Sequence, residues 1–577
     1  MPNVPDSPLG RIALCCSGGG YRAASFHLGA MSYLNRVRYK GKPLLENVKA
    51  ISTVSGGTIS GVVYALHKQR GKSFLDIYHF LLERLRQLDL IKTGLEKLNA
   101  NASWTNQEKR RNLINAFAEI YDKEYTDGAT FDVFDDMSDS HLEEVMFNST
   151  EFNHGLIFRF QNKGLFGNRY NNVRRASAGE VKLSDIIAAS SCFTGGFEPI
   201  EWPDDFLHSS SPHMKEDLGK WEKAGLMDGG IYDNQGIDSI IRSEARVSTQ
   251  PFDMIIVSDV TSPYMDPFTF HDPQEFAGVR SLSYLDIKDK LKTLWIRSQR
   301  FLWLLMVAGL LLPLSVDYSN HIVTGIGLML AVMTTTILFG THWARGKMRR
   351  LIKDTSNYLW SEVPEFYRTK LSALDLQHFQ VGRIEPLILD RIFSLSTLVM
   401  NVFLKTVRRL VYGRLYQPEK YQYRRMSNLI RELTEADYGQ QMERGKDNPT
   451  YYQNLPGCKS LLKGDYDTVF GAGIKSVAEK AASFGTTLWF TEDDELVDML
   501  DQLLASGQCS MCFNLLVYLT ELKHTPGNGY EQLSMQARGE IDYLWDQCEA
   551  DWILFKEDPQ FLVQQLGTVN NRSLDLT

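Results

Sequence analysis

A strand, a glycine turn and a helix follow one another twice within the first 70 residues. The two units comprise residues 11–16, 18–20 and 23–37, then residues 48–54, 56–57 and 59–68. Each begins with a short apolar run and continues, after its glycines, with apolar residues at helical spacing. Two such units in succession predict an α/β fold with a mainly parallel central sheet and helices on its faces.

Further elements follow along the first half of the chain. Residues 70–145 have a mainly helical, charged pattern and predict a cap or peripheral layer. Val145 to Phe160 alternates like paired strands around a turn at Asn153 to Gly155. Leu183 to Ser191 predicts a helix, and Asp253 to Val260 predicts another strand.

Composition excludes several classes of protein. With 577 residues the chain is long enough for more than one structural unit, and its net charge of -8 without a basic cluster argues against a nucleic-acid partner. Seven scattered cysteines do not resemble a disulfide framework, so we expect a reducing compartment. The N-terminus lacks the pattern of a secretory signal, so we expect the catalytic end to stay in the cytoplasm.

Two apolar segments, residues 301–316 and 322–344, flank a polar turn at residues 317–320. As a helix the second would reach roughly 34 Å, against a hydrocarbon core of about 30 Å. The first contains Pro313 and is shorter, so a re-entrant hairpin stays open beside a full span. A buried hairpin in a soluble core is the third alternative.

Basic residues lie outside both ends of this pair, and the turn between the segments has none. They are Lys288, Lys290, Lys292, Arg297 and Arg300 before it, and Arg345, Lys347, Arg349 and Arg350 after it. The positive-inside rule then predicts an integral membrane hairpin over residues 301–344, with the catalytic domain and the C-terminal region on the cytoplasmic side.

The sequence therefore predicts three regions. They are a catalytic domain at residues 1–285, a membrane hairpin at residues 286–350, and a mainly helical region at residues 351–577. Gly485 to Thr491 is a candidate for one further strand that rejoins the catalytic sheet. The basic, tyrosine-rich stretch from Lys405 to Arg425 suits either an anionic lipid surface or an ordinary solvated helix face.

Ser55 stands where the second strand turns into its helix. A hydroxyl on such a turn projects from the sheet, and the following helix N-terminus favours developing negative charge. Gly56 and Gly57 let the backbone bend there. Thr53 occupies the position of the first glycine in the usual Gly-x-Ser-x-Gly elbow, so the match is imperfect.

Two further motifs accompany Ser55. The run Gly18-Gly19-Gly20 can aim consecutive backbone N–H groups into an anion site, either an oxyanion hole or, less consistently with its spacing, a phosphate site. Asp228, followed by Gly229 and Gly230, is a candidate base for Ser55, although Asp-Gly pairs more often cap turns.

Other candidates are weaker. Cys509 and Cys512 have zinc or redox spacing without a second pair, which favours two core cysteines. His27 is better explained as a packed or capping histidine than as a triad base. Because no calcium loop or cluster of metal ligands is found, we expect neither a metal nor a cofactor.

Together these motifs resemble the patatin-like phospholipase family over about residues 10–262. The similarity lies in Gly18 to Arg22, in Ser55 with its elbow, and in Asp228-Gly229-Gly230. Weaker similarity is found at residues 147–160 and 188–199, between the motifs, and at residues 254–260, after them. The resemblance implies a three-layer sandwich and a Ser55–Asp228 dyad, with Gly18, Gly19 and Gly20 as the oxyanion hole.

The implied activity is acyl-ester hydrolysis of membrane phospholipid, of the phospholipase A or lysophospholipase type. Arg22 either braces the glycine loop or contacts a lipid phosphate, and Gly56, Gly57, Gly229 and Gly230 support the elbow and the dyad. Two alternatives remain: an acyltransferase with the same dyad, and a catalytically weak membrane scaffold that binds lipid or protein.

Overall fold

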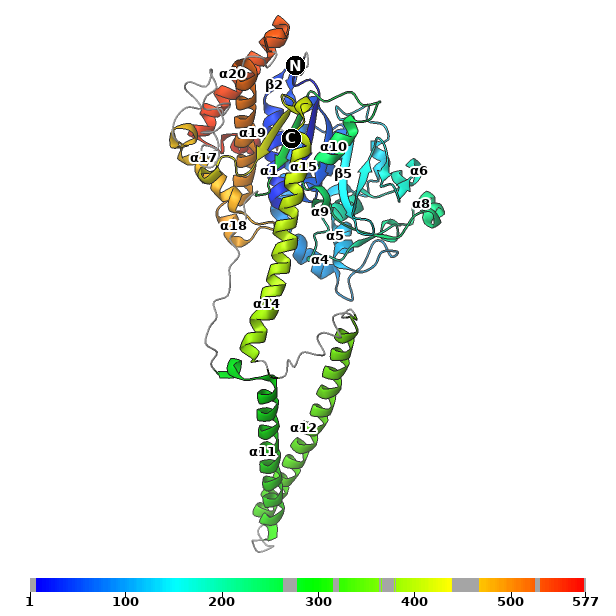
Figure 1. Cartoon of the computed structure of the whole chain (residues 1–577), viewed down its shortest axis with the longest axis vertical. Helices are drawn as coiled ribbons and strands as arrows, with labels where there is room; N and C mark the ends of the chain where they lie inside the picture. Colours follow the sequence, from blue (N-terminus) through cyan, green and yellow to red (C-terminus); the bar gives the residue numbers. More distant parts are fainter. Residues whose placement is uncertain are drawn as a thin grey trace. The chain divides into compact units, whose positions relative to one another are not determined.

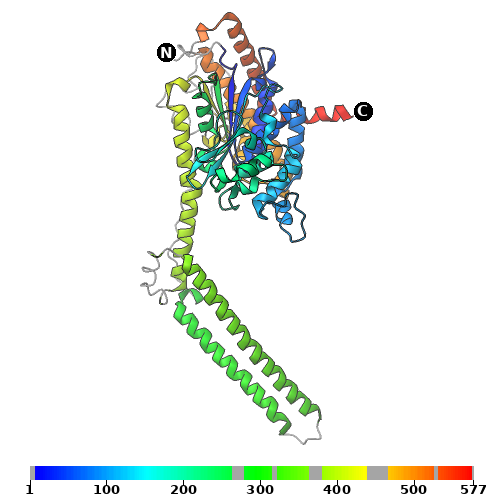
Figure 2. The ribbon, with the colours of Figure 1, turned by 90° about the vertical axis from the view of Figure 1, so that its right-hand side faces the viewer.

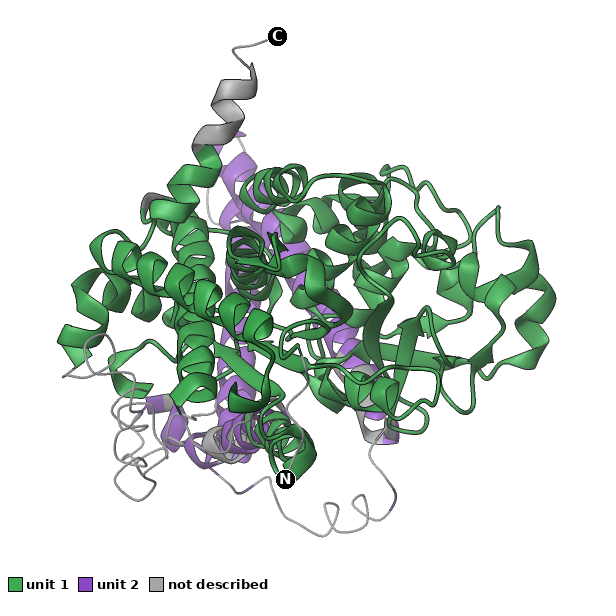
Figure 3. Cartoon of the chain, turned by 90° about the horizontal axis from the view of Figure 1, so that it is seen from above, with its two compact units in different colours: residues 1–265, 401–577 green, residues 266–400 purple. Residues whose placement is uncertain are grey.

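The computed structural model describes residues 7–262, 278–314, 321–362, 365, 378, 380–437, 466–524 and 530–574. The chain forms two compact units, which Figure 3 colours separately. Unit 1 comprises residues 1–265 and 401–577, and unit 2 comprises residues 266–400. The C-terminal region predicted at 351–577 is thus divided, and everything after residue 400 folds with the N-terminal domain.

Within the described residues, unit 1 is built on one ten-stranded sheet. Its strands are β1 (Ile12–Cys16), β4 (Val48–Val54), β5 (Glu144–Glu151), β6 (Leu156–Gln161), β7 (Phe166–Gly167), β8 (Asn172–Val173), β9 (Ile200–Trp202), β10 (Ala224–Asp228), β11 (Met254–Asp259) and β12 (Arg425–Leu429). The order is β12-β11-β1-β4-β5-β6-β7-β8, and β10 pairs with β5 and β9. The first five strands are parallel, and the pairs beyond β5 are antiparallel. β2 (Arg38–Tyr39) and β3 (Lys42–Pro43) form a separate small hairpin.

The remaining elements of unit 1 are mainly helices (Figure 1). They are α1 (Gly20–Arg36), α2 (Gly56–Gln69), α3 (Phe74–Gln87), α4 (Leu90–Lys97), α5 (Leu113–Tyr121), α6 (Arg175–Gly179), α7 (Leu183–Ser190), α8 (Pro212–Asp217), α9 (Gly230–Asp233), α10 (Ile237–Glu244), α15 (Leu404–Tyr416), α17 (Tyr466–Ser483), α18 (Glu492–Leu496), α19 (Met499–His524), α20 (Met535–Glu557) and α21 (Phe561–Leu574). Residues 70–145 contain α3, α4 and α5, which pack against α1, α2 and α7.

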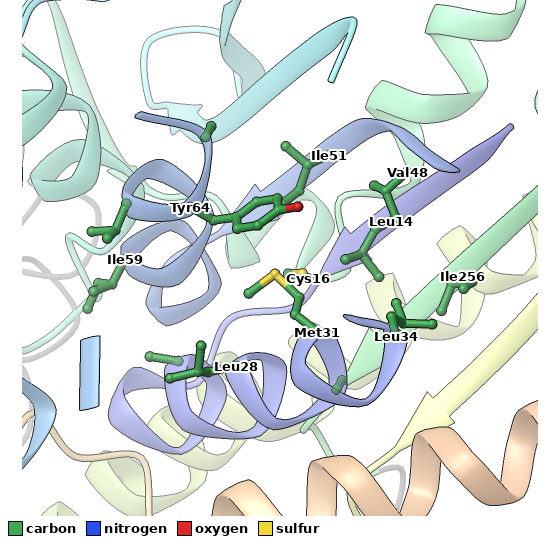
Figure 4. Close-up of a cluster of buried hydrophobic side chains, with 14 of the residues drawn as sticks. Leu14, Cys16, Leu28, Met31, Leu34, Val48, Ile51, Ile59, Tyr64 and Ile256 are labelled. Atoms are coloured by element: carbon green, nitrogen blue, oxygen red, sulfur yellow. The ribbon is translucent and has the colours of Figure 1, made fainter. Parts of the chain in front are cut away.

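Alternate side chains of β1 enter two different cores, because successive residues of a strand point to opposite faces. Ile12, Leu14 and Cys16 join a large core with α1, α2 and α19, part of which Figure 4 shows. Ala13 and Cys15 join a smaller core with α10 and α15. Helices thus cover both faces of the sheet, and the predicted mixed α/β fold with a mainly parallel sheet is confirmed.

The strand that extends the sheet from the C-terminal region is β12, not residues 485–491. β12 pairs in parallel with β11 at the edge of the sheet. The 485–491 segment has no strand geometry. Its Thr487 carbonyl instead accepts the Tyr21 N–H at 2.8 Å, and its Leu488 carbonyl accepts the Leu90 N–H at 3.4 Å. The apolar run was misassigned because it packs against helices.

Three helices are long and apolar enough to span a membrane, judged by length and composition among the described residues. They cover Leu285–Leu314, His321–Leu351 and Met499–His524. In the third, which is α19, 94% of the apolar window is buried inside the protein, against 6% and 17% in the first two. α19 is therefore a core helix of unit 1.

The other two candidates belong to unit 2, where α11 (Tyr284–Leu311) and α12 (His321–Glu362) run side by side (Figure 2). A further helix, α14 (Val381–Thr397), follows them. The Arg345 guanidinium lies 4.6 Å from the centre of the Trp295 ring, and Gln299 donates to Thr341 at 3.3 Å. At the other end a Cβ on Gly309 would lie 2.8 Å from the Gly327 carbonyl, so the two backbones nearly touch there. The predicted turn at 317–320 lies outside the described residues.

A close helix crossing makes the docking of the C-terminal half on α1 testable. A Cβ on Gly507 of α19 would lie 2.1 Å from the Phe26 carbonyl of α1, whereas a Cβ on Gly539 of α20 would meet nothing within 4 Å. Gly507→Ala should therefore cost about 1–3 kcal/mol by overpacking. Gly539→Ala should be neutral, or stabilising by up to about 1 kcal/mol. Thermal denaturation followed by circular dichroism measures both, and equal shifts would contradict this packing.

Candidate active site

Ser55 occupies a sharp turn between β4 and α2. Its backbone has φ 51° and ψ -123°, a conformation that non-glycine residues rarely adopt. Such strain persists only where the surroundings enforce it. The side chain lies at the carboxyl end of a central parallel strand, and Ser55 is 8% exposed.

The glycines after Ser55 permit backbone contact with the end of β1. A Cβ on Gly56 would lie 2.1 Å from the Gly20 carbonyl, and a Cβ on Gly57 would lie 2.6 Å from the carbonyls of Cys16 and Ser17. Neither position has room for a side chain. The elbow and the glycine loop are therefore packed directly on one another.

A chain of hydroxyl groups supports the elbow from beneath. The Ser55 N–H donates to Ser190 Oγ at 2.9 Å, and Ser190 Oγ donates to the Asn148 carbonyl at 2.7 Å. Thr58 Oγ1 lies 2.8 Å from Ser190 Oγ and 2.9 Å from Thr53 Oγ1. Sequence analysis missed Ser190, since a single serine at a helix end carries no distinguishing pattern.

Thr53, the departure from the usual elbow, is accommodated by a glycine on the helix. A Cβ on Gly61 of α2 would lie 2.5 Å from Thr53 Cγ2. In the usual elbow, a glycine at the position of Thr53 allows the strand and the helix to pack closely. Here the glycine at this contact is Gly61, on the helix. The Thr53 methyl group fills the space this leaves, and its hydroxyl joins the chain under Ser55.

Asp228 ends β10 and lies beside Ser55. Its Oδ1 accepts the Gly230 N–H at 2.7 Å. Burial raises the pKa of Asp228 to about 6, while the nearby Ser55 hydroxyl and the Gly230 N–H act in the opposite direction. A Cβ on Gly229 would lie 2.4 Å from the Asn148 carbonyl, so this glycine lets β10 approach β5.

The N–H groups of Gly18, Gly19 and Gly20 differ in whether they have a hydrogen-bond partner in the protein. The Gly18 N–H donates to the Asn234 carbonyl at 3.1 Å. Gly19 and Gly20 have φ of 148° and 60°, and within the described part of the chain their N–H groups make no hydrogen bond. The same holds for the N–H of Gly56 at the start of α2. Within the described residues, three N–H groups around Ser55 thus carry no hydrogen bond to the protein.

Arg22 and His27, both on α1, hydrogen-bond to residues other than Ser55 and Asp228. Arg22 donates to the Phe484 carbonyl at 2.6 Å and to Thr486 Oγ1 at 3.2 Å. His27 Nε2 donates to the Ser17 carbonyl at 2.9 Å, and burial lowers its pKa to about 4. Among the described residues, no histidine hydrogen-bonds to Ser55 or Asp228.

The described residues offer little else that resembles a reaction centre. No group of three or more His, Cys, Asp or Glu side chains that could hold a metal occurs among them. A cavity of about 740 Å³ lies elsewhere and is lined by polar residues such as Asp135, Arg175 and Glu180. Several of its charged side chains are paired within the protein, since Arg175 contacts Asp135 and His213 contacts Glu180.

Fold and site together define a mixed α/β protein with a serine at a strand-to-helix elbow, beside a buried aspartate. Residues 14–241, which include Ser55 and Asp228, match the family model described as patatin-like phospholipase. The chain therefore contains a patatin-like phospholipase domain, as the sequence resemblance predicted. This domain supports lipid acyl hydrolase activity in general. No curated protein matches the chain.

The buried carboxylate should make Asp228→Asn more stable than the wild type above about pH 6. Asp228 keeps its proton up to about pH 6 in the folded protein, whereas the unfolded chain loses it near pH 3.8. Folding stability therefore falls between these values, and the full penalty is present above them. The uncharged variant should gain as much as about 3 kcal/mol at pH 8 and less than about 1 kcal/mol at pH 4.

Chemical denaturation at the two pH values measures this difference. Asp139→Asn, which changes an exposed side chain, is the matched control and should behave as the wild type at both. Equal stability of Asp228→Asn and the wild type at pH 8 would show that the carboxylate carries no burial penalty.

Proposed function

We propose that the protein hydrolyses acyl esters of membrane phospholipids with a Ser55–Asp228 dyad, as a phospholipase A or lysophospholipase. The observation that carries this proposal is the position of the strained Ser55 turn beside the buried Asp228, whose pKa burial raises to about 6. At neutral pH such a carboxylate is ionised, and it is more basic than an ordinary aspartate. No histidine is required as an intermediary.

In the proposed first step, Ser55 Oγ attacks the ester carbonyl while Asp228 accepts the hydroxyl proton. The oxyanion that forms is held by the N–H groups of Gly19, Gly20 and Gly56, which carry no other hydrogen bond within the described residues. Gly18, whose N–H donates to Asn234, instead fixes the loop. The C–O bond then breaks, and Asp228 returns the proton to the departing alcohol oxygen.

In the second step water releases the acyl group. Asp228 accepts a proton from a water molecule as its oxygen attacks the acyl-enzyme carbonyl, and the same N–H groups hold the second oxyanion. Collapse returns the proton to Ser55 Oγ and frees the fatty acid. Removing one oxyanion donor typically costs about 2.7–4 kcal/mol of transition-state stabilisation.

For Arg22 we propose the bracing role. Its two hydrogen bonds go to residues 484–486, and the adjoining Thr487 carbonyl accepts the Tyr21 N–H. These contacts tie the start of α1, and with it Gly20, to the C-terminal half of unit 1. The third guanidinium nitrogen, Nε, is buried without a hydrogen-bond partner among the described residues.

We further propose that α11 and α12 anchor the protein in the membrane, with both units' remaining parts on the cytoplasmic side. Their apolar windows are almost wholly exposed in the protein, which suits contact with lipid. The basic residues outside both ends support the sidedness. An anchored enzyme stays at the surface where its insoluble substrate lies.

The basic stretch from Lys405 to Arg425 is better explained without lipid. Arg408, Arg414 and Arg424 contact Asp259, Asp238 and Glu244, respectively, all within unit 1. Tyr412 donates to Asp259 at 3.0 Å. Most of this stretch therefore docks α15 and β12 onto the domain.

Release of fatty acid from phospholipid vesicles tests the dyad. Ser55→Ala and Asp228→Asn should each lower the rate by about 10⁴-fold or more, because each removes a group that acts in every turnover. Ser210→Ala and Asp139→Asn make the same substitutions at exposed positions and should leave the rate unchanged. Wild-type rates in Asp228→Asn, with its fold intact, would exclude the aspartate as the base.

Extraction of cell membranes at alkaline pH tests the anchor. Val332 of α12 is 64% exposed, and Val247 of unit 1 is fully exposed. Val332→Asp should shift protein from the membrane pellet to the supernatant, since an Asp at the centre of a spanning helix costs about 2.5–3.5 kcal/mol. Val247→Asp should not. Complete extraction of the wild type at alkaline pH would exclude an integral anchor.

A further inference from the structure

A buried carboxylate, Asp259, lies at the end of β11, one strand from the glycine loop. It is fully buried, and its Oδ2 accepts hydrogen bonds from Arg408 Nε and the Tyr412 hydroxyl, each at 3.0 Å. Burial opposes ionisation, but Arg408 together with the hydrogen bonds from Thr261 and Tyr412 outweighs it and holds the pKa of Asp259 below its ordinary value. Both donors stand on α15, the first helix of unit 1 after unit 2.

The third donor to Asp259 Oδ2 is Gln235, whose Nε2 lies 3.3 Å away. Gln235 is completely buried and belongs to residues 229–236, which we call the dyad loop. Asp233 stiffens this loop, because its Oδ1 accepts the N–H groups of Gln235 and Gly236, both at 3.0 Å. Asp259 thus links Arg408 and Tyr412 to the dyad loop, against which α15 also packs directly at α9.

The dyad loop contacts both halves of the site. At its start the Gly230 N–H donates to Asp228 Oδ1 at 2.7 Å. Near its end the Asn234 carbonyl accepts the Gly18 N–H at 3.1 Å. A displacement of this loop would therefore move the aspartate and the glycine loop relative to Ser55.

A second contact holds the other side of the loop. Asp238, the second residue of α10, is fully buried and contacts Arg414 of α15. Arg159 contacts the same carboxylate, and Arg242 donates to it at 2.8 Å. α15 therefore grips the chain on both sides of residues 235–238.

We propose that Arg408 and Tyr412 are positioning residues of the active site, which fix the dyad loop through Asp259 and Gln235. Neither residue touches the reacting atoms. The proposal rests on the proposed hydrolase function. It goes beyond the docking of α15, because it predicts that these two side chains raise the catalytic rate per active site. A misplacement of about 1 Å in a site can cost as much as about 100-fold in rate.

The test uses the full-length protein in detergent with three variants. Arg408→Ala removes the cation, and Tyr412→Phe removes only one hydroxyl, so the second variant stays informative where the first fails to fold. Arg409→Ala is the matched control, since Arg409 is the next residue on α15, is exposed, and donates to Thr406 within its own helix.

Two measurements separate positioning from stability. One is kcat and KM on a soluble aryl butyrate ester, with kcat divided by the active sites titrated with a fluorophosphonate. The other is amide hydrogen exchange in peptides covering residues 17–22 and 229–236. For Arg408→Ala we expect kcat per titrated site to fall at least about tenfold with KM within about twofold. Tyr412→Phe should show a smaller fall, and both variants should exchange faster in the two peptides.

A loss of thermal stability with unchanged kcat per titrated site would overturn the proposal and leave α15 a merely docked helix. Wild-type exchange in both peptides would also overturn it. The exchange arm is repeated in the Ser55→Ala background, where no turnover is needed. A wild type that neither hydrolyses ester nor reacts with the fluorophosphonate refutes the proposed function and, with it, the proposed effect of Arg408 on the rate. Exchange that is faster in both peptides would, in that case, still establish the mechanical link.

Discussion

Backbone contact between the Ser55 turn and the glycine loop is the constraint on which the site depends. Gly56 and Gly57 lie against Gly20, Cys16 and Ser17 with no space for a Cβ. Two parallel strands, β1 and β4, must end side by side for this contact to form. The positive φ of Ser55 and the N–H groups of Gly19 and Gly20, unpaired within the described residues, occur at this contact. Neither turn can change its backbone conformation there without colliding with the other.

The same edge of the sheet is completed by residues far along the chain. β11 ends at Asp259 on the edge that carries Ser55, and its parallel neighbour β12 comes only after unit 2. A connection between parallel neighbours must cross a face of the sheet, and here the returning chain supplies α15 for that purpose. The hairpin of α11 and α12 is thus inserted into the crossover connection between β11 and β12. The sheet of unit 1 is complete only after the chain returns from unit 2.

Sequence patterns predicted the local parts of this arrangement well and the distant ones poorly. β4 begins and ends at the predicted residues, because an apolar run there is bounded by a polar residue and the Ser55 turn. β12 was missed, since only Met426 and Asn428 of its five residues are buried. Residues 485–491 were misassigned because Phe490 packs on Tyr21 and Phe484, not on the sheet. The pairing of Arg408 with Asp259 joins residues 149 positions apart, a separation that no short pattern encodes.

Burial of two carboxylates near Ser55 has opposite chemical consequences, and the difference lies in their partners. Asp228 receives one backbone N–H, lies beside the Ser55 hydroxyl and has no cation as partner among the described residues, so burial leaves it a stronger base. Asp259 receives Arg408 as well as neutral donors, so it stays ionised and cannot readily accept a proton. One carboxylate is thus left able to exchange a proton with Ser55, while the other is locked as a structural anion. Arg408, together with the hydrogen bonds from Thr261 and Tyr412, thus keeps Asp259 ionised beside the dyad loop despite its burial.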